Sequence, residues 1–467
     1  MQRTLERPMH DMLRRAARRT SLHMPGAQGK APFGRWNPYR LETTELGITD
    51  DLYRPSGAIA RAQALAAKSA GAADTLLLHG GSTAGIHAML LYAARRGDEV
   101  ILPRNTHISA IQLCAVAGLV PAFASPSYTA AGRPYTTPES YLRAMEEHPR
   151  ARAALVVRPD YYGLMPDLRA IARLAHERGM LLLCDEAHGA HLNWDAQAEN
   201  ALACGADLCV QSAHKTLPAL NAGAWLHAAR GVDAQRLRGV LRMVQTSSPS
   251  FVAMLALDDA RAWMDAHGAR ACADLRAAAA EFHRAAAALG YLDGQAAPPP
   301  GTCFDPLRVV LDAPQGGFEL SAQLEALGLD VELCDACGIG CILSLMDGKK
   351  RLALLLRALK RVNRARLELP KGHGLPLAMP PRALPPCVIP LDTAAFAPAE
   401  PVALPSAIGR VSAAQVGLYP PGVALLTAGE LVTEEIAHYL MAIEPSHLFG
   451  VGAGETISCV QIKGENQ

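Results

Sequence analysis

A lysine near the middle of the chain lies in a pattern that suits covalent chemistry. The segment 206–217 reads ADLCVQSAHKTL, in which the apolar run Leu208–Gln211 is followed at once by Ser212, His214 and Lys215. A lysine on a rigid turn after a buried strand offers an amine at a fixed place, and desolvation keeps such an amine nucleophilic. The pattern therefore favours Lys215 as the residue that holds an aldehyde cofactor as a Schiff base, with Ser212 and His214 donating to a phosphate. The alternative is a surface lysine after a strand, which is the commoner fate of a single lysine.

A second apolar run ends in a carboxylate. Residues 181–191 read LLLCDEAHGAH, so that Asp185 closes the run and His188 follows three residues later. A carboxylate there suits a protonated pyridine nitrogen, and this pairing makes a pyridine ring an electron sink for a carbanion. Two alternatives have less support. The letters DEAH also occur in nucleotide-driven helicases, but the chain has no G-x-x-x-x-G-K-[ST] phosphate loop, and His188 with His191 lack the further ligands of a metal site.

A glycine-rich turn is the third candidate. Residues 79–89 read HGGSTAGIHAM, which predicts a strand end, a turn of small residues and a helix start. The N–H groups of Gly81, Ser82 and Thr83 at that helix start would form an anion site. An ordinary strand-to-helix turn is the alternative.

The fourth candidate is a histidine. Residues 102–109 read LPRNTHIS, which places His107 at the start of a predicted helix. Its flat ring would stack on a cofactor ring, or it merely caps the turn. The phosphate loop, His107, Asp185 and Lys215 follow four different apolar runs in that chain order, and four such coincidences in one order are far rarer than one.

These groups need a scaffold that brings strand ends together, and residues 65–230 have the pattern of one. Short apolar runs alternate there with helical stretches such as 84–96 and 166–178, the second of which opens with Pro166 and stops at Gly179. This alternation indicates a mainly parallel sheet covered on both faces, with the chemistry in loops at the carboxyl ends of the strands. The expected strands are Thr75–His79, Glu99–Leu102, Val120–Ala124, Ala153–Val157, Leu181–Cys184, Leu208–Gln211 and Ala224–His227.

Proline-rich stretches mark the expected boundaries. An Ala-rich helical stretch over about 255–289 is followed by residues 296–301, which contain three consecutive prolines, and a second Pro-rich stretch covers about 370–390. We therefore predict three parts. An N-terminal segment over 1–64 packs on a large cofactor-binding domain over 65–295, and a C-terminal domain covers 296–467.

The composition limits the classes of protein to which the chain can belong. The chain has 467 residues, half of them hydrophobic. Its net charge of +1 does not indicate binding to nucleic acid or to an anionic membrane. No apolar run approaches the roughly 20 residues of a membrane helix. The first twenty residues lack the apolar centre of a secretory signal, so we expect a cytoplasmic protein whose eleven cysteines are reduced thiols.

Three of these cysteines form a local cluster. Cys334, Cys337 and Cys341 have the spacing C-x2-C-x3-C, and thiolates are soft metal ligands. Only three ligands are local, however, so we favour buried or loop thiols and predict no metal.

The combined motifs are specific enough to point to a family. The chain resembles the Orn/Lys/Arg decarboxylase family of fold-type-I pyridoxal-phosphate enzymes, particularly its shorter bacterial members, over nearly its whole length. The matching stretches are SLHMPGAQG (21–29), LETTELGITDDLYRPSG (41–57), GGSTAG (80–85), ILPRNTHIS (101–109), RPDYYGLMPDL (158–168), DEAHGAH (185–191), QSAHKTLPAL (211–220), QTSSPSF (245–251) and GLYPPGVALLTAGE (417–430).

The resemblance implies a fold and an activity. The fold would be that of the PLP-dependent transferases (aspartate aminotransferase-like, fold type I), an α/β large domain around a mainly parallel seven-stranded sheet with a smaller α+β C-terminal domain. The activity would be PLP-dependent decarboxylation of arginine, lysine or ornithine to the corresponding amine, as in polyamine biosynthesis. A homodimer or higher even oligomer is implied as well.

The resemblance also implies residue roles. Lys215 would carry pyridoxal 5'-phosphate, Asp185 would pair with the ring nitrogen, His107 would stack on the ring, and His214 or Lys215 would protonate the substrate carbon. Glu430 is a candidate for the cationic tail of the substrate. The expected cofactor-binding residues are Gly81, Ser82, Thr83, His107, Asp185, His188, Ser212, His214, Lys215, and Thr246 with Ser247, one of which would reach the phosphate of the neighbouring subunit.

Departures from the family pattern keep alternatives open. Residues 25–29 read PGAQG where the family usually has a PGHKG-like run, and Asp160 stands where a Thr usually precedes the paired tyrosines. Another fold-type-I activity, an aminotransferase or a Cα–Cβ lyase, would share Lys215 and Asp185. A catalytically silent relative that binds a partner is the third hypothesis, and the intact Lys215 and Asp185 argue against it.

Overall fold

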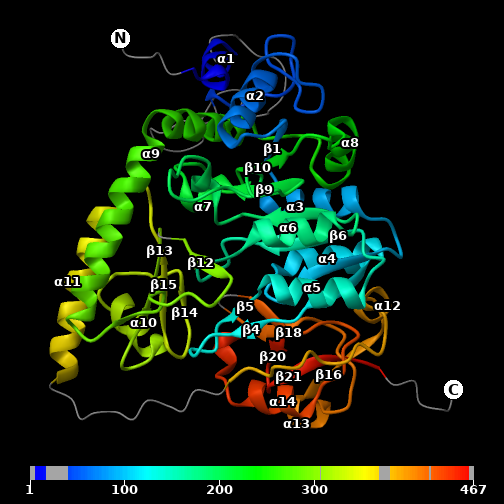
Figure 1. Cartoon of the computed structure of the whole chain (residues 1–467), viewed down its shortest axis with the longest axis vertical. Coiled ribbons are helices and arrows are strands. Elements are labelled where there is room, and N and C mark those ends of the chain that lie inside the picture. The colour runs from blue at the N-terminus through cyan, green and yellow to red at the C-terminus, as the bar shows by residue number, and fades with distance from the viewer. Residues whose placement is uncertain (1–5, 17–39, 306, 368–378, 420–421, 462–467) are drawn as a thin grey trace. The chain divides into compact units, whose positions relative to one another are not determined.

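The computed structural model describes residues 6–16, 40–305, 307–367, 379–419 and 422–461 (Figure 1). Contacts divide the chain into two compact units, each built from three stretches of sequence. The first unit takes Met1–Tyr92, Leu182–Ala279 and Ile342–Arg351, and the second takes Ala93–Leu181, Ala280–Cys341 and Leu352–Gln467. The predicted division at residues 64 and 295 stays a prediction.

The first unit carries four neighbouring strands. β10 pairs antiparallel with β1 on one side and with β9 on the other, and β9 pairs parallel with β8. Because β10 reverses direction between its neighbours, β1, β9 and β8 all run the same way. The four strands are β1 (Asp74–Leu78), β8 (Leu181–Asp185), β9 (Leu208–Ser212) and β10 (Ala224–Ala228).

Helices surround these strands along the chain. Those wholly or mostly in the first unit are α1 (Pro8–Ala16), α2 (Ala58–Ala70), α3 (Gly81–Ala93), η2 (Ala190–Asn193), α7 (Ala213–Thr216), α8 (Ala234–Val244) and α9 (Phe251–Ala287). α1 packs on α2, as the two blue helices in Figure 1 show. Their buried faces are mainly apolar, with Met9, Met12 and Ile59 almost fully covered.

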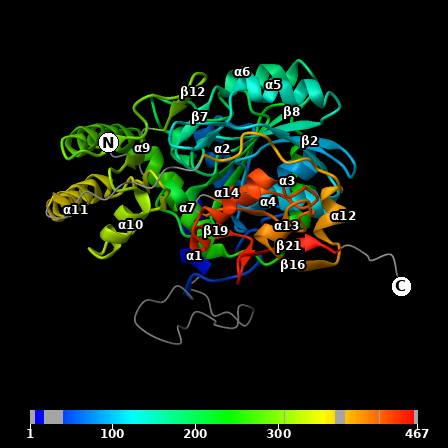
Figure 2. The same ribbon diagram turned by 90° about the horizontal axis from the view of Figure 1, so that it is seen from below.

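The second unit carries the other strands of the main sheet. β2 (Glu99–Pro103) lies between β3 (Val120–Ala124) and β6 (Ala153–Val157) and is parallel to both. The helices that follow them are α4 (Ile108–Ala117), α5 (Pro138–Glu147) and α6 (Leu168–His176). Figure 2 shows α5 and α6 side by side, and the two helices are in contact.

The rest of the second unit consists of small sheets and helices. A four-stranded sheet has the order β11-β13-β15-β14, two three-stranded sheets have the orders β16-β21-β20 and β18-β17-β19, and β12-β7 and β4-β5 are pairs. The strands are β4 (Ser127–Tyr128), β5 (Pro134–Tyr135), β7 (Leu164–Pro166), β11 (Leu292–Asp293), β12 (Thr302–Phe304), β13 (Arg308–Asp312), β14 (Leu333–Cys334), β15 (Gly338–Ile342), β16 (Ala399–Ala403), β17 (Val416–Leu418), β18 (Val423–Leu426), β19 (Leu448–Phe449), β20 (Val451–Gly452) and β21 (Thr456–Val460). The helices are α10 (Gly317–Glu325), α11 (Gly348–Leu367), α12 (Leu391–Ala395), α13 (Leu404–Ala407), α14 (Glu434–Met441) and η3 (Pro445–His447).

The main sheet confirms the predicted architecture. Its seven strands have the order β1-β10-β9-β8-β6-β2-β3, and each predicted strand is confirmed to within one residue at either end. The sheet is mainly parallel, with β10 as an antiparallel member. A small C-terminal α+β region with its own core, which includes Val416, Leu426 and Ile457, is confirmed too.

The helix predicted over 166–178 begins later than expected. Pro166 is the last residue of β7, opposite Thr302 of β12. The helix α6 starts at Leu168, and Asp167 caps it by accepting the N–H of Ala170 at 3.1 Å. Proline lacks an N–H, so it suits a helix start and the edge of a strand equally well, and the sequence pattern did not separate the two.

Among the residues that the structure describes, every helix is too short or too polar to cross a lipid bilayer.

Candidate active site

Three strand ends that carry predicted site residues meet at one edge of the sheet in the first unit. In the strand register, Leu78 of β1 is opposite Ala224, and Ala224 is opposite Ser212 of β9. On the other side of β9, Asp185 of β8 is opposite Val210. Because β1, β8 and β9 run the same way, the loops that follow them leave the sheet together. The phosphate loop, the carboxylate and the lysine turn are therefore neighbours.

Lys215 lies in α7, a single helical turn between β9 and β10. Its Nζ is 3.2 Å from Nε2 of His188, which is buried. The N–H of Ala213 donates to the carbonyl of Gly223 at 3.1 Å, and this bond joins the two ends of the segment between β9 and β10. Nδ1 of His214 donates to the same carbonyl at 3.2 Å. A turn held at both ends gives the Lys215 amine a fixed place, which covalent capture of an aldehyde requires.

Asp185 closes β8 and is buried, with 4% of its surface exposed. Its Oδ1 accepts the N–H of Ala187 at 3.1 Å. This bond fixes the carboxylate at the start of the turn that carries His188, whose ring contacts Lys215. A buried carboxylate at the end of a strand suits a ligand with a protonated ring nitrogen.

The start of α3 suits an anion. Gly81 has φ of 69°, a left-handed conformation that glycine adopts without strain. Its N–H donates to the carbonyl of Ala222 at 2.9 Å, so an anion there would be met by the next residues, Ser82 and Thr83. At the same sheet edge the Oγ of Ser212 is fully buried and has no hydrogen-bond partner among the described residues. A buried hydroxyl that lacks a hydrogen-bond partner and lies near a helix start suits the binding of a phosphate ester. The residues present therefore fit pyridoxal phosphate.

Gly85 sets how closely α3 approaches the strands. A Cβ at this position would come within 2.4 Å of Val210 Cγ2 and 2.8 Å of Leu78 Cδ1. Both neighbours are buried residues of the sheet. Glycine is therefore needed here for the helix start to lie at its observed height above β1 and β9.

Thr246 and Ser247 are exposed and follow α8. The residue before them, Gln245, accepts the N–H of His79 through its side-chain oxygen at 3.2 Å. The Tyr53 hydroxyl donates to the carbonyls of Gln245, at 3.3 Å, and of Thr246. These bonds tie the segment to the end of β1, close to the phosphate loop of the same unit. That one of the two residues reaches the neighbouring subunit stays a prediction.

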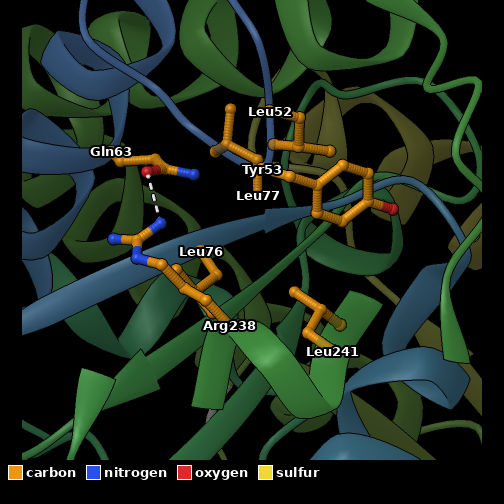
Figure 3. A pocket seen from close by; sticks show the side chains of 7 residues that line it. All are labelled: Leu52, Tyr53, Gln63, Leu76, Leu77, Arg238 and Leu241. Atoms are coloured by element: carbon orange, nitrogen blue, oxygen red, sulfur yellow. Dashed lines mark hydrogen bonds between the residues drawn. The ribbon is translucent and has the colours of Figure 1, made fainter. Parts of the chain in front are cut away.

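A small cavity near this segment does not belong to the site. Figure 3 shows it lined by Leu52, Tyr53, Gln63, Leu76, Leu77, Arg238 and Leu241, with the Gln63 side-chain oxygen hydrogen-bonded to Arg238. Its volume of about 10 Å³ has room for one water molecule. It is far too small for a cofactor.

His107 lies in the second unit and is exposed. It is the N-cap of α4, where its Nδ1 accepts the N–H of Ser109 at 3.2 Å and lies 2.8 Å from the Ser109 hydroxyl. The capping alternative considered from the sequence is thus observed. Capping uses one ring nitrogen and leaves the ring face uninvolved, so stacking on a cofactor stays a prediction.

Glu430 also lies in the second unit, and its surroundings weigh against a substrate role. Its carboxylate is 3% exposed and forms a two-point ion pair with Arg104. One of its oxygens also accepts the N–H of Thr427 at 2.7 Å. A carboxylate engaged in this way would have to lose a buried partner before it met a substrate cation.

The cysteine cluster shows no metal geometry. No group of three or more His, Cys, Asp or Glu residues that could hold a metal ion occurs in the described part of the chain. Burial raises the pKa of the Cys334 and Cys337 thiols and raises that of Cys341 to about 12. The three thiols are therefore protonated near neutral pH, and the absence of a metal stays a prediction.

Two predicted signatures fall partly or wholly outside the described residues. The altered PGAQG run at 25–29 lies outside them, as do Pro420 and Pro421 of the C-terminal signature.

Sequence reasoning missed a set of buried polar residues behind the site. Gln211 and His227 lie inside otherwise apolar strands and are each 1% exposed. The available signal was a polar letter within the runs LCVQS and AWLHA. Such a residue needs a buried partner, which the sequence alone does not name.

Comparisons with known proteins agree with this geometry. The family model described as Orn/Lys/Arg decarboxylase, major domain, matches residues 40–294, and the one described as Orn/Lys/Arg decarboxylase, C-terminal domain, matches residues 393–449. The arginine decarboxylase of Bacillus subtilis is 30% identical over 460 residues, which cover 93% of each chain. An uncharacterized protein of the same organism is 32% identical over 450 residues, covering 92% of each chain.

Solved structures show the fold. The constitutive lysine decarboxylase of E. coli superposes with a TM-score of 0.82 at 19% identity, covering 98% of this chain and 82% of its own. An L-threonine transaldolase from Pseudomonas fluorescens, solved in its internal aldimine state, gives a TM-score of 0.53 at 15% identity, covering 65% of this chain and 72% of its own. These likenesses confirm the predicted fold type I architecture. With matches to both family domains and relatives over nine-tenths of its length, the chain belongs to the Orn/Lys/Arg decarboxylase family.

Proposed function

We propose that this chain is a pyridoxal-phosphate enzyme that removes CO2 from a basic amino acid, with arginine as the substrate. The single observation that carries the proposal is the sheet edge at which Lys215, Asp185 and the unmet hydroxyl of Ser212 come together. Relatives at 28–30% identity that are named arginine decarboxylase support the choice of arginine over lysine and ornithine.

Each residue has a defined task under this proposal. When bound, pyridoxal phosphate supplies an electron-accepting ring conjugated to the substrate amine. Lys215 holds the cofactor through its amine, and His188, at 3.2 Å, orients that amine and exchanges a proton with it. Asp185 holds a proton at the ring nitrogen.

The phosphate and the proton to the product need donors as well. The Ser212 hydroxyl and the start of α3 at Ser82 and Thr83 hold the phosphate. Lys215 or His214 delivers the proton to the substrate carbon after CO2 leaves. His214 is already oriented for this by its bond to the carbonyl of Gly223.

We further propose a homodimer or higher even oligomer in the cytoplasm as the working form. The support is the exposed Thr246 and Ser247 segment beside the phosphate loop, which the family resemblance assigns to the neighbouring subunit. Light scattering of the purified full chain tests the oligomer, and a monomeric active enzyme would contradict it.

The decisive experiment is CO2 release from arginine, lysine and ornithine, each supplied separately with pyridoxal phosphate. We expect CO2 from arginine, and loss of both activity and the visible absorbance of bound cofactor in Lys215→Ala. Arg270→Ala, at a highly exposed position of α9 that has no role in the proposed site, serves as the folding control. Bound cofactor without CO2 from any of the three amino acids would replace decarboxylation by another fold-type-I activity, and no cofactor binding at all would favour a silent relative.

A further inference from the structure

A row of buried polar side chains crosses the first unit next to the site. Oγ1 of Thr75 is 2.7 Å from Nδ1 of His227, Nε2 of His227 is 3.0 Å from Oε1 of Gln211, and Nε2 of Gln211 is 2.7 Å from Oε2 of Glu186. The four residues belong to β1, β10, β9 and the turn after β8. At most 1% of each is exposed.

The chemistry of these groups fixes the direction of the row. The side-chain oxygen of Gln211 only accepts, so Nε2 of His227 carries the hydrogen and donates to it. Burial lowers the pKa of His227 to about 3, so its ring is neutral and Nδ1 accepts from the Thr75 hydroxyl. The Gln211 amide then donates to the carboxylate of Glu186. Every donor in the row therefore points toward Glu186.

Two asparagines, Asn193 and Asn200, extend this hydrogen-bond network beside Gln211. Nδ2 of Asn193 donates to Oε1 of Gln211 at 2.8 Å, and Nε2 of Gln211 donates to Oδ1 of Asn193 at 3.0 Å. Asn200 donates to the same Oδ1 at 2.8 Å and to the carbonyl of Ala70 at 2.9 Å. Gln211 is thus the branching residue, and its amide cannot rotate without the loss of several bonds at once.

Two members of the row are next in sequence to residues that are proposed to hold the cofactor. Gln211 directly precedes Ser212, and Glu186 directly follows Asp185. Side chains alternate between the two faces of a strand, so Gln211 and Ser212 point to opposite faces of β9. The Gln211–Glu186 bond joins the end of β9 to the turn after β8, and the N–H of Glu186 adds a second link by donating to the carbonyl of Val210 at 2.9 Å.

Buried polar groups are costly unless they are fully paired, so a paired row specifies one geometry. We propose that Gln211, His227 and Thr75 are positioning residues that act through Glu186 to hold Asp185 and Ser212 at the spacing the cofactor requires. This inference rests on the proposed function, because it needs a cofactor that spans the two strand ends. It assigns no contact with substrate or cofactor to the row itself.

The test uses the full chain with His227→Leu and His227→Gln. The glutamine amide can donate to Gln211 in place of Nε2, whereas leucine removes both bonds of the ring. The dissociation constant for pyridoxal phosphate is measured from the visible absorbance of the bound cofactor, together with the pH midpoint of that absorbance. We expect His227→Leu to weaken cofactor binding roughly tenfold, the size of one buried hydrogen bond left half-made, and to shift the pH midpoint. His227→Gln should recover most of the affinity.

Tyr141→Phe is the matched control. It removes one buried hydrogen bond, from the Tyr141 hydroxyl to the carbonyl of Leu155 at 2.9 Å, in the second unit. We expect it to lower the melting temperature and to leave cofactor affinity and the pH midpoint unchanged. Wild-type affinity and midpoint in His227→Leu, with only a lower melting temperature, would overturn the proposal.

A milder variant covers the case in which His227→Leu does not fold. Thr75→Val removes one bond at the far end of the row with little change in shape. A weaker but measurable shift in the same two readouts supports the row, and unchanged readouts overturn it. A wild-type chain that binds no pyridoxal phosphate overturns the proposed function and this inference with it. A wild type that binds, with variants that bind equally well, overturns only the inference.

Discussion

Arg104 and Glu430 form a buried two-point ion pair, with Nη1–Oε1 at 2.8 Å and Nη2–Oε2 at 2.6 Å. Each side chain is 3% exposed, and Arg104 also donates to the carbonyls of Ala424 and Leu425. The pair ties the C-terminal signature to the loop that carries His107. Glu430 thus has a buried partner within the protein, and its contact with substrate stays a prediction.

We expect Glu430→Ala to lower the free energy of unfolding by about 3–5 kcal/mol, because it leaves the Arg104 charge buried and unpaired. The double variant Arg104→Leu, Glu430→Leu should recover part of this loss. Urea unfolding of the full chain measures both. Arg152→Ala, which breaks an exposed ion pair with Asp98 in the same unit, should leave stability nearly unchanged. A stable Glu430→Ala with a raised KM for arginine would contradict this expectation and support the predicted substrate role.

Asp160 makes stability depend on pH. It is buried, its Oδ1 accepts the N–H groups of Tyr162 and Leu164, and burial raises its pKa to about 7. An aspartate in the unfolded chain titrates near about 4, so between about pH 4 and 7 only the folded state keeps the proton. The stabilising contribution is full below about pH 4 and is lost as the pH rises to about 7.

Asp160→Asn keeps the acceptor oxygen and removes this titration. The unfolding free energy of the variant should therefore rise relative to wild type between about pH 4 and 7, by up to roughly 4 kcal/mol. Denaturant unfolding at a series of pH values gives the two curves. Parallel curves across that range would show that Asp160 does not hold its proton in the folded state.

Gly85 predicts a packing effect. Alanine at this position would place a methyl group against Val210 and Leu78, and overpacking of this kind costs about 1–3 kcal/mol. We expect Gly85→Ala to be destabilised and to bind pyridoxal phosphate more weakly, because the start of α3 is pushed from the sheet. Gly239→Ala is the control: Gly239 is an exposed position within α8, and an added Cβ would meet no neighbouring atom within 4 Å, so this variant should gain stability. Equal melting temperatures for the two variants would contradict this account.

The sequence predicted the sheet well because each strand is a short apolar run bounded by turn residues. It also predicted that Asp185 and Ser212 end apolar strands and that Lys215 follows one closely, as observed, whereas their roles at a cofactor stay predictions. The pairing of strands that brings these residues together was harder to predict. The antiparallel direction of β10 cannot be read from AWLHA, since an apolar run has no direction of pairing.

The partners of buried polar groups could not be predicted either. Arg104 and Glu430 are 326 residues apart in the chain, and Gln211 of β9 and Glu186 in the turn after β8 are 25 apart. No local pattern links such pairs, because their contact depends on which strands become neighbours. The sequence therefore did not reveal that the charge of Glu430 is paired with that of Arg104.

The reversed strand β10 has a consequence for folding. It is joined to β9 by the short lysine turn, whereas its other neighbour, β1, comes from a distant part of the sequence. Local pairings close first because their loops lose less entropy, so we expect the β9–β10 hairpin to form while the far edge of β10 is still open. An open, apolar edge strand is a template for aggregation. Docking of β1 therefore both brings the phosphate loop to the lysine turn and covers the open edge of β10, and it leaves β1 as the edge strand of the finished sheet.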